Sequence, residues 1–158
     1  MPTLQELNDE RDIKLVYCAY CDIIDAKDFD RLTEVFTRDA VQDYTSTLGP
    51  AGLMTGTEPL IAGAKIHMGK DSNCGQTHHN VLNFRIDVAG DTATAKVHYY
   101  AVHLGQKKYP GAIYSMWGEY DDKLVRTPEG WRVNHRLYRC FLTDGPNVTY
   151  NEEAVQAG

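Results

Sequence analysis

Apolar residues recur every three or four positions through the first part of the chain. Between Asp9 and Asp25 this spacing draws one continuous apolar face along a helix. The residues of that face are Ile13, Val16, Tyr17, Tyr20, Cys21 and Ile24. We therefore predict an amphipathic helix over residues 9–25 that packs its apolar face against a core.

In the next part of the chain, short apolar segments alternate with helix-capping residues and with residues that end helices and strands. Capping residues precede two apolar segments, and a stretch rich in Gly, Pro, Ser and Thr separates them. The expected elements are a helix at 29–36 capped by Asp28, a strand at 41–45, an irregular loop at 46–56, and a helix at 58–68 capped by Thr57 and ended by Gly69.

Strand periodicity replaces helix periodicity in the second half. Apolar residues at 82, 84, 86 and 88 alternate with polar ones, and glycine-containing turns at 89–91 and 128–130 separate longer strands. Those longer strands are expected at 92–104, 112–125 and 131–143. Helices followed by long antiparallel strands indicate an α+β fold, with the helices on one face of the sheet. A sheet curved around a helix also leaves a pocket at its open end.

Length and charge narrow the class of protein. The 158 residues, with a formal net charge of −6 and scattered Lys and Arg, suit one domain and disfavour nucleic acid or an anionic membrane surface as partners. No apolar run is long enough for a membrane helix, and the first residues lack the pattern of a secretory signal. We expect a cytoplasmic protein whose four cysteines, Cys18, Cys21, Cys74 and Cys140, are reduced.

Asp25 stands at an unfavourable place for a carboxylate. It closes the first predicted helix, and a helix C-terminus carries partial negative charge, so an acid there needs a cationic partner. Partial burial would add to that need. The run Gln76-Thr77-His78-His79 could supply a histidine and form an acid–base pair. The alternative is that Asp25 lies in solvent at a frayed helix end.

The order of the predicted elements resembles the cone-shaped fold of nuclear transport factor 2, which the SnoaL-like polyketide cyclases and the scytalone dehydratases share. Four segments carry this resemblance. They are Asp25 to Leu32, Val41 to Tyr44, Thr77 to His79, and Gly130 to Val133. The resemblance implies a single SnoaL-like domain over residues 1–158, with a core at about 6–142 and a C-terminal tail at 143–158. It also implies a dimer or trimer formed through the outer face of the sheet.

The resemblance to the dehydratases places a catalytic pair at Asp25 and His79, 54 positions apart. Strand alternation favours His78 instead, because His78 is in phase with Leu82 and Phe84. A bulge near an active site can shift that phase by one residue, so both histidines stay open. His78 and His103 also match the spacing of two pocket histidines in the dehydratases.

Three further kinds of side chain are candidates for the site. The hydroxyl of Tyr44 could donate to a carbonyl oxygen, or Tyr44 could pack in the core. His103 is in phase with the small and apolar residues of its strand and could face the pocket, or could be a buried structural histidine. Tyr17 and Tyr20 could form pocket wall or ordinary core. The dehydratases carry a tyrosine directly before their aspartate, where this chain has Ile24, so a substrate other than scytalone is expected.

These residues predict a cofactor-independent lyase of the dehydratase type. His79, oriented by Asp25, would remove a proton next to the carbonyl of a small cyclic hydroxy-carbonyl compound, such as a polyketide, terpenoid or aromatic catabolite, while Tyr44 and His103 stabilise the enolate oxygen. An isomerase or a polyketide-type cyclase would begin with the same step, and a non-catalytic binding domain is the other alternative. No ligand spacing for a metal and no glycine-rich phosphate loop is visible, so we expect neither a metal nor a nucleotide cofactor.

Overall fold

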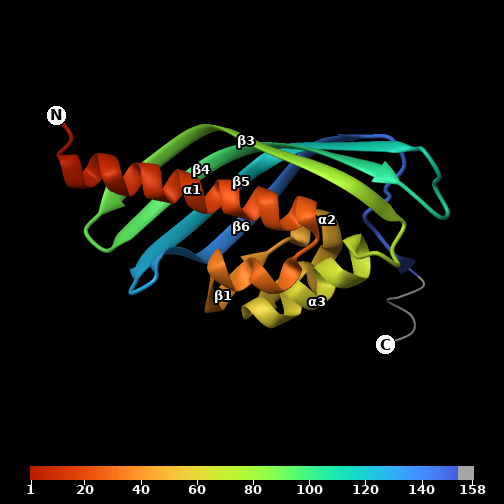
Figure 1. The fold of residues 1–158 in the computed structure, drawn as a ribbon, viewed down its shortest axis with the longest axis horizontal. Helices are drawn as coiled ribbons and strands as arrows, with labels where there is room; N and C mark the ends of the chain where they lie inside the picture. Colours follow the sequence, from red (N-terminus) through yellow and green to blue (C-terminus); the bar gives the residue numbers. More distant parts are fainter. Residues whose placement is uncertain (153–158) are drawn as a thin grey trace.

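The computed structural model describes residues 1–152, and Figure 1 shows one long helix lying along a curved sheet. The helix, α1, spans Leu4–Ala26. The shorter helical segments lie together beneath its C-terminal end (Figure 1). This arrangement confirms the predicted α+β class, with helices on one face of a curved sheet.

Helix α1 starts earlier than its apolar pattern suggests because Thr3 caps it. The Thr3 hydroxyl accepts from the Glu6 backbone N–H, and the Glu6 carboxylate accepts from the Thr3 backbone N–H, which satisfies two otherwise free donors. The buried residues include every member of the predicted apolar face. Lys27 ends the helix in the left-handed conformation, with a φ of 58°.

The sheet has six strands in the order β2-β1-β6-β5-β4-β3. The strands are β1 (Phe36–Asp43), β2 (Leu53–Thr55), β3 (Cys74–Ala89), β4 (Thr92–Gly105), β5 (Ile113–Thr127) and β6 (Gly130–Asp144). Strands β3 to β6 form the two predicted antiparallel hairpins. Strand β1 pairs in parallel with β6, so the sheet is mixed and not wholly antiparallel.

The short elements depart from their predicted form. The segment predicted as a helix at 29–36 is a 3-10 turn, Phe29–Glu34, and β1 starts directly after it. The expected loop at 46–56 contains a helical turn, α2 (Thr45–Leu48), a 3-10 turn (Gly49–Gly52) and β2. Helix α3 spans Thr57–Met68, and Thr57 is its first residue, not its cap, because the Thr57 hydroxyl donates to the backbone carbonyl of Thr37.

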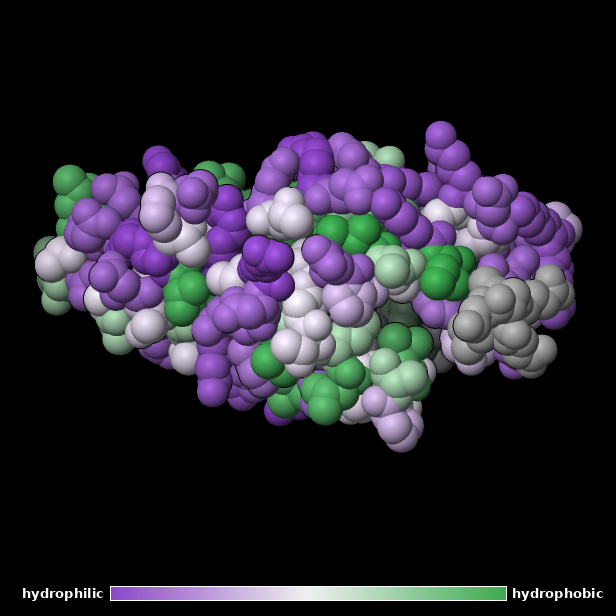
Figure 2. All heavy atoms as spheres, turned by 90° about the horizontal axis from the view of Figure 1, so that it is seen from below, coloured by the Kyte–Doolittle hydropathy of each residue, from purple (hydrophilic) through white to green (hydrophobic). Residues whose placement is uncertain are grey.

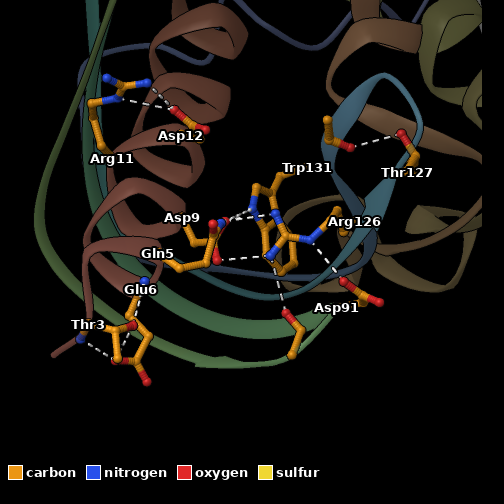
Figure 3. A network of polar contacts seen from close by, with 12 residues as sticks. Thr3, Gln5, Glu6, Asp9, Arg11, Asp12, Asp91, Arg126, Thr127 and Trp131 are labelled. Carbon is orange, nitrogen blue, oxygen red and sulfur yellow. Dashed lines mark hydrogen bonds and ion pairs between the residues drawn. The ribbon is translucent and has the colours of Figure 1, made fainter.

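A buried carboxylate ties the start of α1 to the β5–β6 hairpin (Figure 3). Both oxygens of Asp9 accept from the Arg126 guanidinium, at 2.7 and 2.8 Å, and the Trp131 indole N–H donates to Asp9 at 3.2 Å. Arg126 also pairs with Asp91 in the β3–β4 turn. These bonds hold the helix across the sheet at one end, and the site described below lies at its other end.

Two further observations concern the residues that the structure describes. No helix within 1–152 combines the length and the apolar character that crossing a bilayer requires. All four cysteines are free thiols. The predicted C-terminal tail falls partly outside the described range, which ends before residue 153.

Candidate functional site

Asp25, at the end of α1, meets His79 of β3. The His79 ring Nδ1 lies 2.7 Å from Asp25 Oδ1, and the His79 backbone N–H donates to Asp25 Oδ2 at 2.9 Å. The His79 side chain is 9 % exposed, and the Asp25 side chain is 23 % exposed. The contact expected from the spacing of the two residues is therefore present, and the cationic partner that a helix-terminal carboxylate needs can form on His79.

A bulge in β3 explains why strand alternation favours His78, whereas in the structure His79 is the histidine that faces inward. The pairing of β3 with β4 shifts between Leu82 and Arg85, around Asn83, whose φ is 53°. Before the bulge His79 pairs with inward-facing Ala101, and Leu82 lies on the outer face, 42 % exposed. Residues after the bulge face inward at even numbers, whereas residues before it face inward at odd numbers.

The bulge leaves His78 outside the fold. Its side chain is 76 % exposed, and its Nδ1 lies 3.9 Å from Asp25 Oδ2. It pairs with Val102, one residue from His103, on the face away from α1. His78 therefore does not face the interior, because the one-residue phase shift turns its side chain to the other face of the sheet, and its contact with a substrate stays a prediction.

Asp25 accepts a third hydrogen bond, from a residue that sequence reasoning did not select. The Thr77 hydroxyl donates to Asp25 Oδ1 at 2.8 Å. Partial burial alone would raise the pKa of Asp25, but the bonds from the His79 ring and backbone and from Thr77 outweigh it and hold this pKa below its usual value. Asp25 is therefore an ionised partner for the imidazole. The signal for Thr77 was strand periodicity, since residues two apart share a face.

The acceptors around the two inward-facing histidines define which ring nitrogen is protonated. An ionised carboxylate can only accept, so Nδ1 of neutral His79 carries the proton and Nε2 is its basic nitrogen. His103 Nδ1 lies 3.2 Å from the backbone carbonyl of Tyr114, which likewise requires a proton on Nδ1. The two rings meet edge to face, with centroids 5.4 Å apart.

His103 is a neutral group in this site. It is fully enclosed, and burial, followed by the neighbouring His79, lowers the pKa of His103 to about 4. With Nδ1 donating to Tyr114, its Nε2 can only accept a hydrogen bond. In this tautomer neutral His103 has no free ring N–H to offer to an enolate oxygen, and its role toward the substrate stays a prediction.

Tyrosines and a buried ion pair occupy the interior next to the dyad. Arg136 and Asp122 are fully buried, 2.8 Å apart, and the rings that surround the guanidinium belong to Tyr17, Tyr20, Phe36 and Tyr120. Asn134 is bulged between β5 and β6, which turns Arg136 inward, so alternation along β6 could not reveal the pair.

The predicted tyrosines have distinct places around this pair. The Tyr17 hydroxyl donates to Asp122 at 2.8 Å, which favours the core alternative for Tyr17. Tyr20 stands edge-on to the His79 ring, with centroids 6.5 Å apart. The Tyr44 hydroxyl lies 3.5 Å from Arg136 Nη1, and its ring stacks on Tyr138. Tyr44 therefore points inward, and its hydroxyl accepts from Arg136 and also interacts with the Tyr20 hydroxyl.

The surface is hollowed in several places. One hollow lies between the start of α1 and β3 and is lined by acidic residues including Glu6, Glu10 and Asp87. Another is lined by Thr92, Leu124 and neighbouring residues. Neither is lined by a residue of the dyad. Figure 2, which looks at the α3 side of the molecule, shows a further hollow bordered by apolar side chains.

This chain is similar to known proteins both in sequence and in fold. The chain is 31 % identical over 144 residues to the uncharacterized protein Rv2910c of Mycobacterium tuberculosis, covering 89 % of this chain and 92 % of that protein. A candidate scytalone dehydratase from Novosphingobium aromaticivorans superposes with a TM-score of 0.76 at 23 % identity, covering 92 % of this chain and 89 % of the other.

Two further solved structures extend this likeness. A hexachlorocyclohexane dehydrochlorinase (LinA) of type 2 has a TM-score of 0.74 at 14 % identity, with 95 % and 97 % of the two chains covered. A nuclear transport factor 2-like superfamily protein from Salmonella enterica has a TM-score of 0.70 at 19 % identity, with 92 % and 96 % covered. These likenesses confirm the predicted cone-shaped fold.

The family follows from the sequence itself. The SnoaL-like domain matches residues 5–137, from the first turns of α1 into β6. This range holds Asp25, His79, His103 and the buried ion pair. The chain belongs to the SnoaL-like domain family, and it shares its fold with a nuclear transport factor 2-like superfamily protein.

Proposed function

We propose that this protein is a cofactor-independent lyase that eliminates water from a small cyclic hydroxy-carbonyl compound. The observation that carries the proposal is the dyad. The nearly enclosed His79 donates from Nδ1 to Oδ1 of an ionised Asp25, with 2.7 Å between these two atoms, and this leaves Nε2 as a base. Loss of such a general base typically costs about 10²- to 10⁴-fold in rate.

The reaction uses one imidazole twice. His79 Nε2 takes the proton from the carbon next to the substrate carbonyl, and the C–H electron pair forms an enolate. Asp25 stabilises the imidazolium that results. The enolate then collapses, the bond to the β-hydroxyl breaks, and the imidazolium returns its proton to the departing oxygen. The products are water and a conjugated enone or phenol, with His79 neutral again.

Two side chains are suited to hold the substrate oxygens. Tyr44, whose hydroxyl accepts from Arg136, can donate its own proton to the enolate oxygen as charge builds there. His103, whose Nε2 only accepts, can bind a substrate hydroxyl as that hydroxyl donates. A carbonyl at Tyr44 and a hydroxyl at His103 would place the reacting carbon near His79, since the His79 and His103 rings touch.

The activities named for two structural neighbours are consistent with this chemistry. A dehydratase loses water and a dehydrochlorinase loses hydrogen chloride, and each elimination removes a proton and a leaving group from adjacent atoms. An isomerase or a cyclase would share the first proton abstraction. A binding domain would abstract no proton at all.

A proton-exchange experiment tests the abstraction step, whichever reaction follows it. The purified protein is incubated in D₂O with a panel of cyclic β-hydroxy ketones, beginning with 3-hydroxycyclohexanone. Exchange of the α-protons is followed by NMR, and formation of the conjugated product by ultraviolet absorption. We expect exchange and elimination that are lost in His79→Ala and kept in His78→Ala, the adjacent but outward-facing control. Equal rates in the two variants would refute the proposal.

We also propose that the protein self-associates as a dimer or trimer through the outer face of its sheet. Tyr100 and Trp117 stack there, with ring centroids 5.0 Å apart, and the exposed Leu142 pairs with Trp117, while the exposed Ile113 lies farther along β5. Exposed apolar patches of this kind commonly mark protein contacts.

The cytoplasmic location remains a prediction.

A further inference from the structure

Asp25 is held by more donors than a dyad needs. Two of its three hydrogen bonds, from Thr77 Oγ1 at 2.8 Å and from His79 Nδ1 at 2.7 Å, end on the same oxygen, Oδ1. The third, from the His79 backbone, ends on Oδ2. The Thr77 hydroxyl and the imidazole therefore share one acceptor atom.

Sharing an acceptor weakens each bond to it. A hydroxyl that donates to a carboxylate oxygen withdraws negative charge from that oxygen and lowers its strength as a partner for a nearby cation. The same hydroxyl fixes the rotation of the carboxylate, because Thr77 and His79 approach Asp25 from one strand face, two residues apart. Thr77 thus acts on both the orientation and the strength of the group that supports the imidazole.

We propose that Thr77 is a positioning residue of the dyad, whose hydroxyl aligns the Asp25 carboxylate and limits how strongly it stabilises the His79 imidazolium. This inference rests on the proposed function of the dyad. Thr77 does not itself touch the reacting atoms in this proposal. It acts through the orientation and the charge of Asp25, which contacts the imidazole.

The fold accounts for the position of Thr77. In the β3–β4 ladder Thr77 lies opposite His103 and His79 opposite Ala101, all on the inward face. The bulge at Asn83 comes later in β3 and so leaves Thr77 and His79 in the same phase. A β-branched threonine also suits a strand.

The charged and titratable groups that surround the His79 ring can be named. Asp25 is the only carboxylate within the described residues that contacts the His79 ring directly. Titratable or charged groups on the packed elements are Tyr20 and Cys21 on α1, Lys27 at its end, the outward-facing His78, whose Nδ1 lies 3.9 Å from Asp25, and His103 on β4. A Thr77 substitution leaves all of these in place, so a change in pH behaviour would report the lost hydroxyl.

The test compares Thr77→Val with Thr77→Ser. Valine keeps the shape and removes the hydroxyl, whereas serine keeps the hydroxyl. In Thr77→Val we expect the acid side of the kcat/KM profile to move to higher pH by about 0.3–1 unit, from the size of one hydrogen bond. In the free protein we expect the His79 Nδ1 proton resonance to move downfield, because its bond to Asp25 strengthens. Thr77→Ser should behave as the natural protein.

The two readouts separate this inference from the proposed function. The NMR measurement needs no substrate, so it stands even if no tested compound is turned over. An unmoved resonance in a folded Thr77→Val, or an equal displacement in Thr77→Ser, would overturn the role of the hydroxyl. If Thr77→Val does not fold, Thr77→Ala makes the same comparison. A moved resonance without any proton abstraction would leave Thr77 with its role and remove the lyase.

Discussion

Removing one partner of the buried Arg136–Asp122 pair should cost a large part of the stability of this protein. Arg136 donates to Asp122 through Nε, at 3.0 and 3.2 Å, and through Nη2, at 2.8 Å, and neither side chain is exposed. Asp122→Asn keeps the shape and leaves the guanidinium buried without a counter-charge. A change of this kind costs about 3–5 kcal/mol, out of a typical total of about 5–15 kcal/mol.

The double replacement should cost less than either single one. In Arg136→Met with Asp122→Leu no buried charge remains, and apolar replacement of a buried pair is often neutral or stabilising. Urea unfolding followed by circular dichroism, at one protein concentration, measures all the variants. Glu10→Gln, which breaks the half-exposed pair with Lys14, is the control and should cost less than about 1 kcal/mol. Single costs below about 1 kcal/mol, or costs that add in the double variant, would refute the reasoning.

Three more outcomes follow from the structure. Asp25→Asn and His79→Ala should each slow turnover by about 10²-fold or more, and the double variant should be little worse, because the two residues act as one unit; additive losses in kcat would contradict this. The pKa of Asp9 is held well below its usual range, chiefly by Arg126, so the ionised Asp9 should stabilise the fold at neutral pH and lose this effect as the pH falls below about 4. In urea unfolding, the stability of Asp9→Asn should therefore fall less on acidification than that of the natural protein, and an equal fall would contradict this role of Asp9. Trp117→Lys, on the outer face of the sheet, should reduce the mass measured by sedimentation without loss of fold, and an unchanged mass would place the contact elsewhere.

The local elements of this fold could be predicted from the sequence because their signals are local. The apolar spacing of α1 and the turns at 89–91 and 128–130 need no knowledge of distant residues, and the structure has α1 and both hairpins. The parallel pairing of β1 with β6 has no such signal. It depends on how the chain returns after more than eighty residues, by the count between Asp43 and Gly130.

The site was harder to predict because two bulges control it. Asn83 and Asn134 each shift the phase of a strand by one residue, and each shift brings a polar side chain inward, His79 in β3 and Arg136 in β6. Asparagine tolerates a positive φ better than most residues, so Asn83 within a strand was a usable signal. Thr77 required both the register of β3 and the end point of α1.

The desolvation cost of burying Arg136 and Asp122 raises the question of what this ion pair contributes to function. Apolar replacement of a buried ion pair such as Arg136–Asp122 often costs a fold little or no stability. The pair contacts Tyr17 and Tyr44, and the Tyr44 hydroxyl is the donor proposed for the enolate oxygen. The apolar double variant would then keep the fold and lose rate, because Tyr44 would no longer be oriented by Arg136. Turnover should therefore fall in the double variant by more than any loss of folded protein explains, and a rate that follows the folded fraction alone would contradict the role proposed for Tyr44.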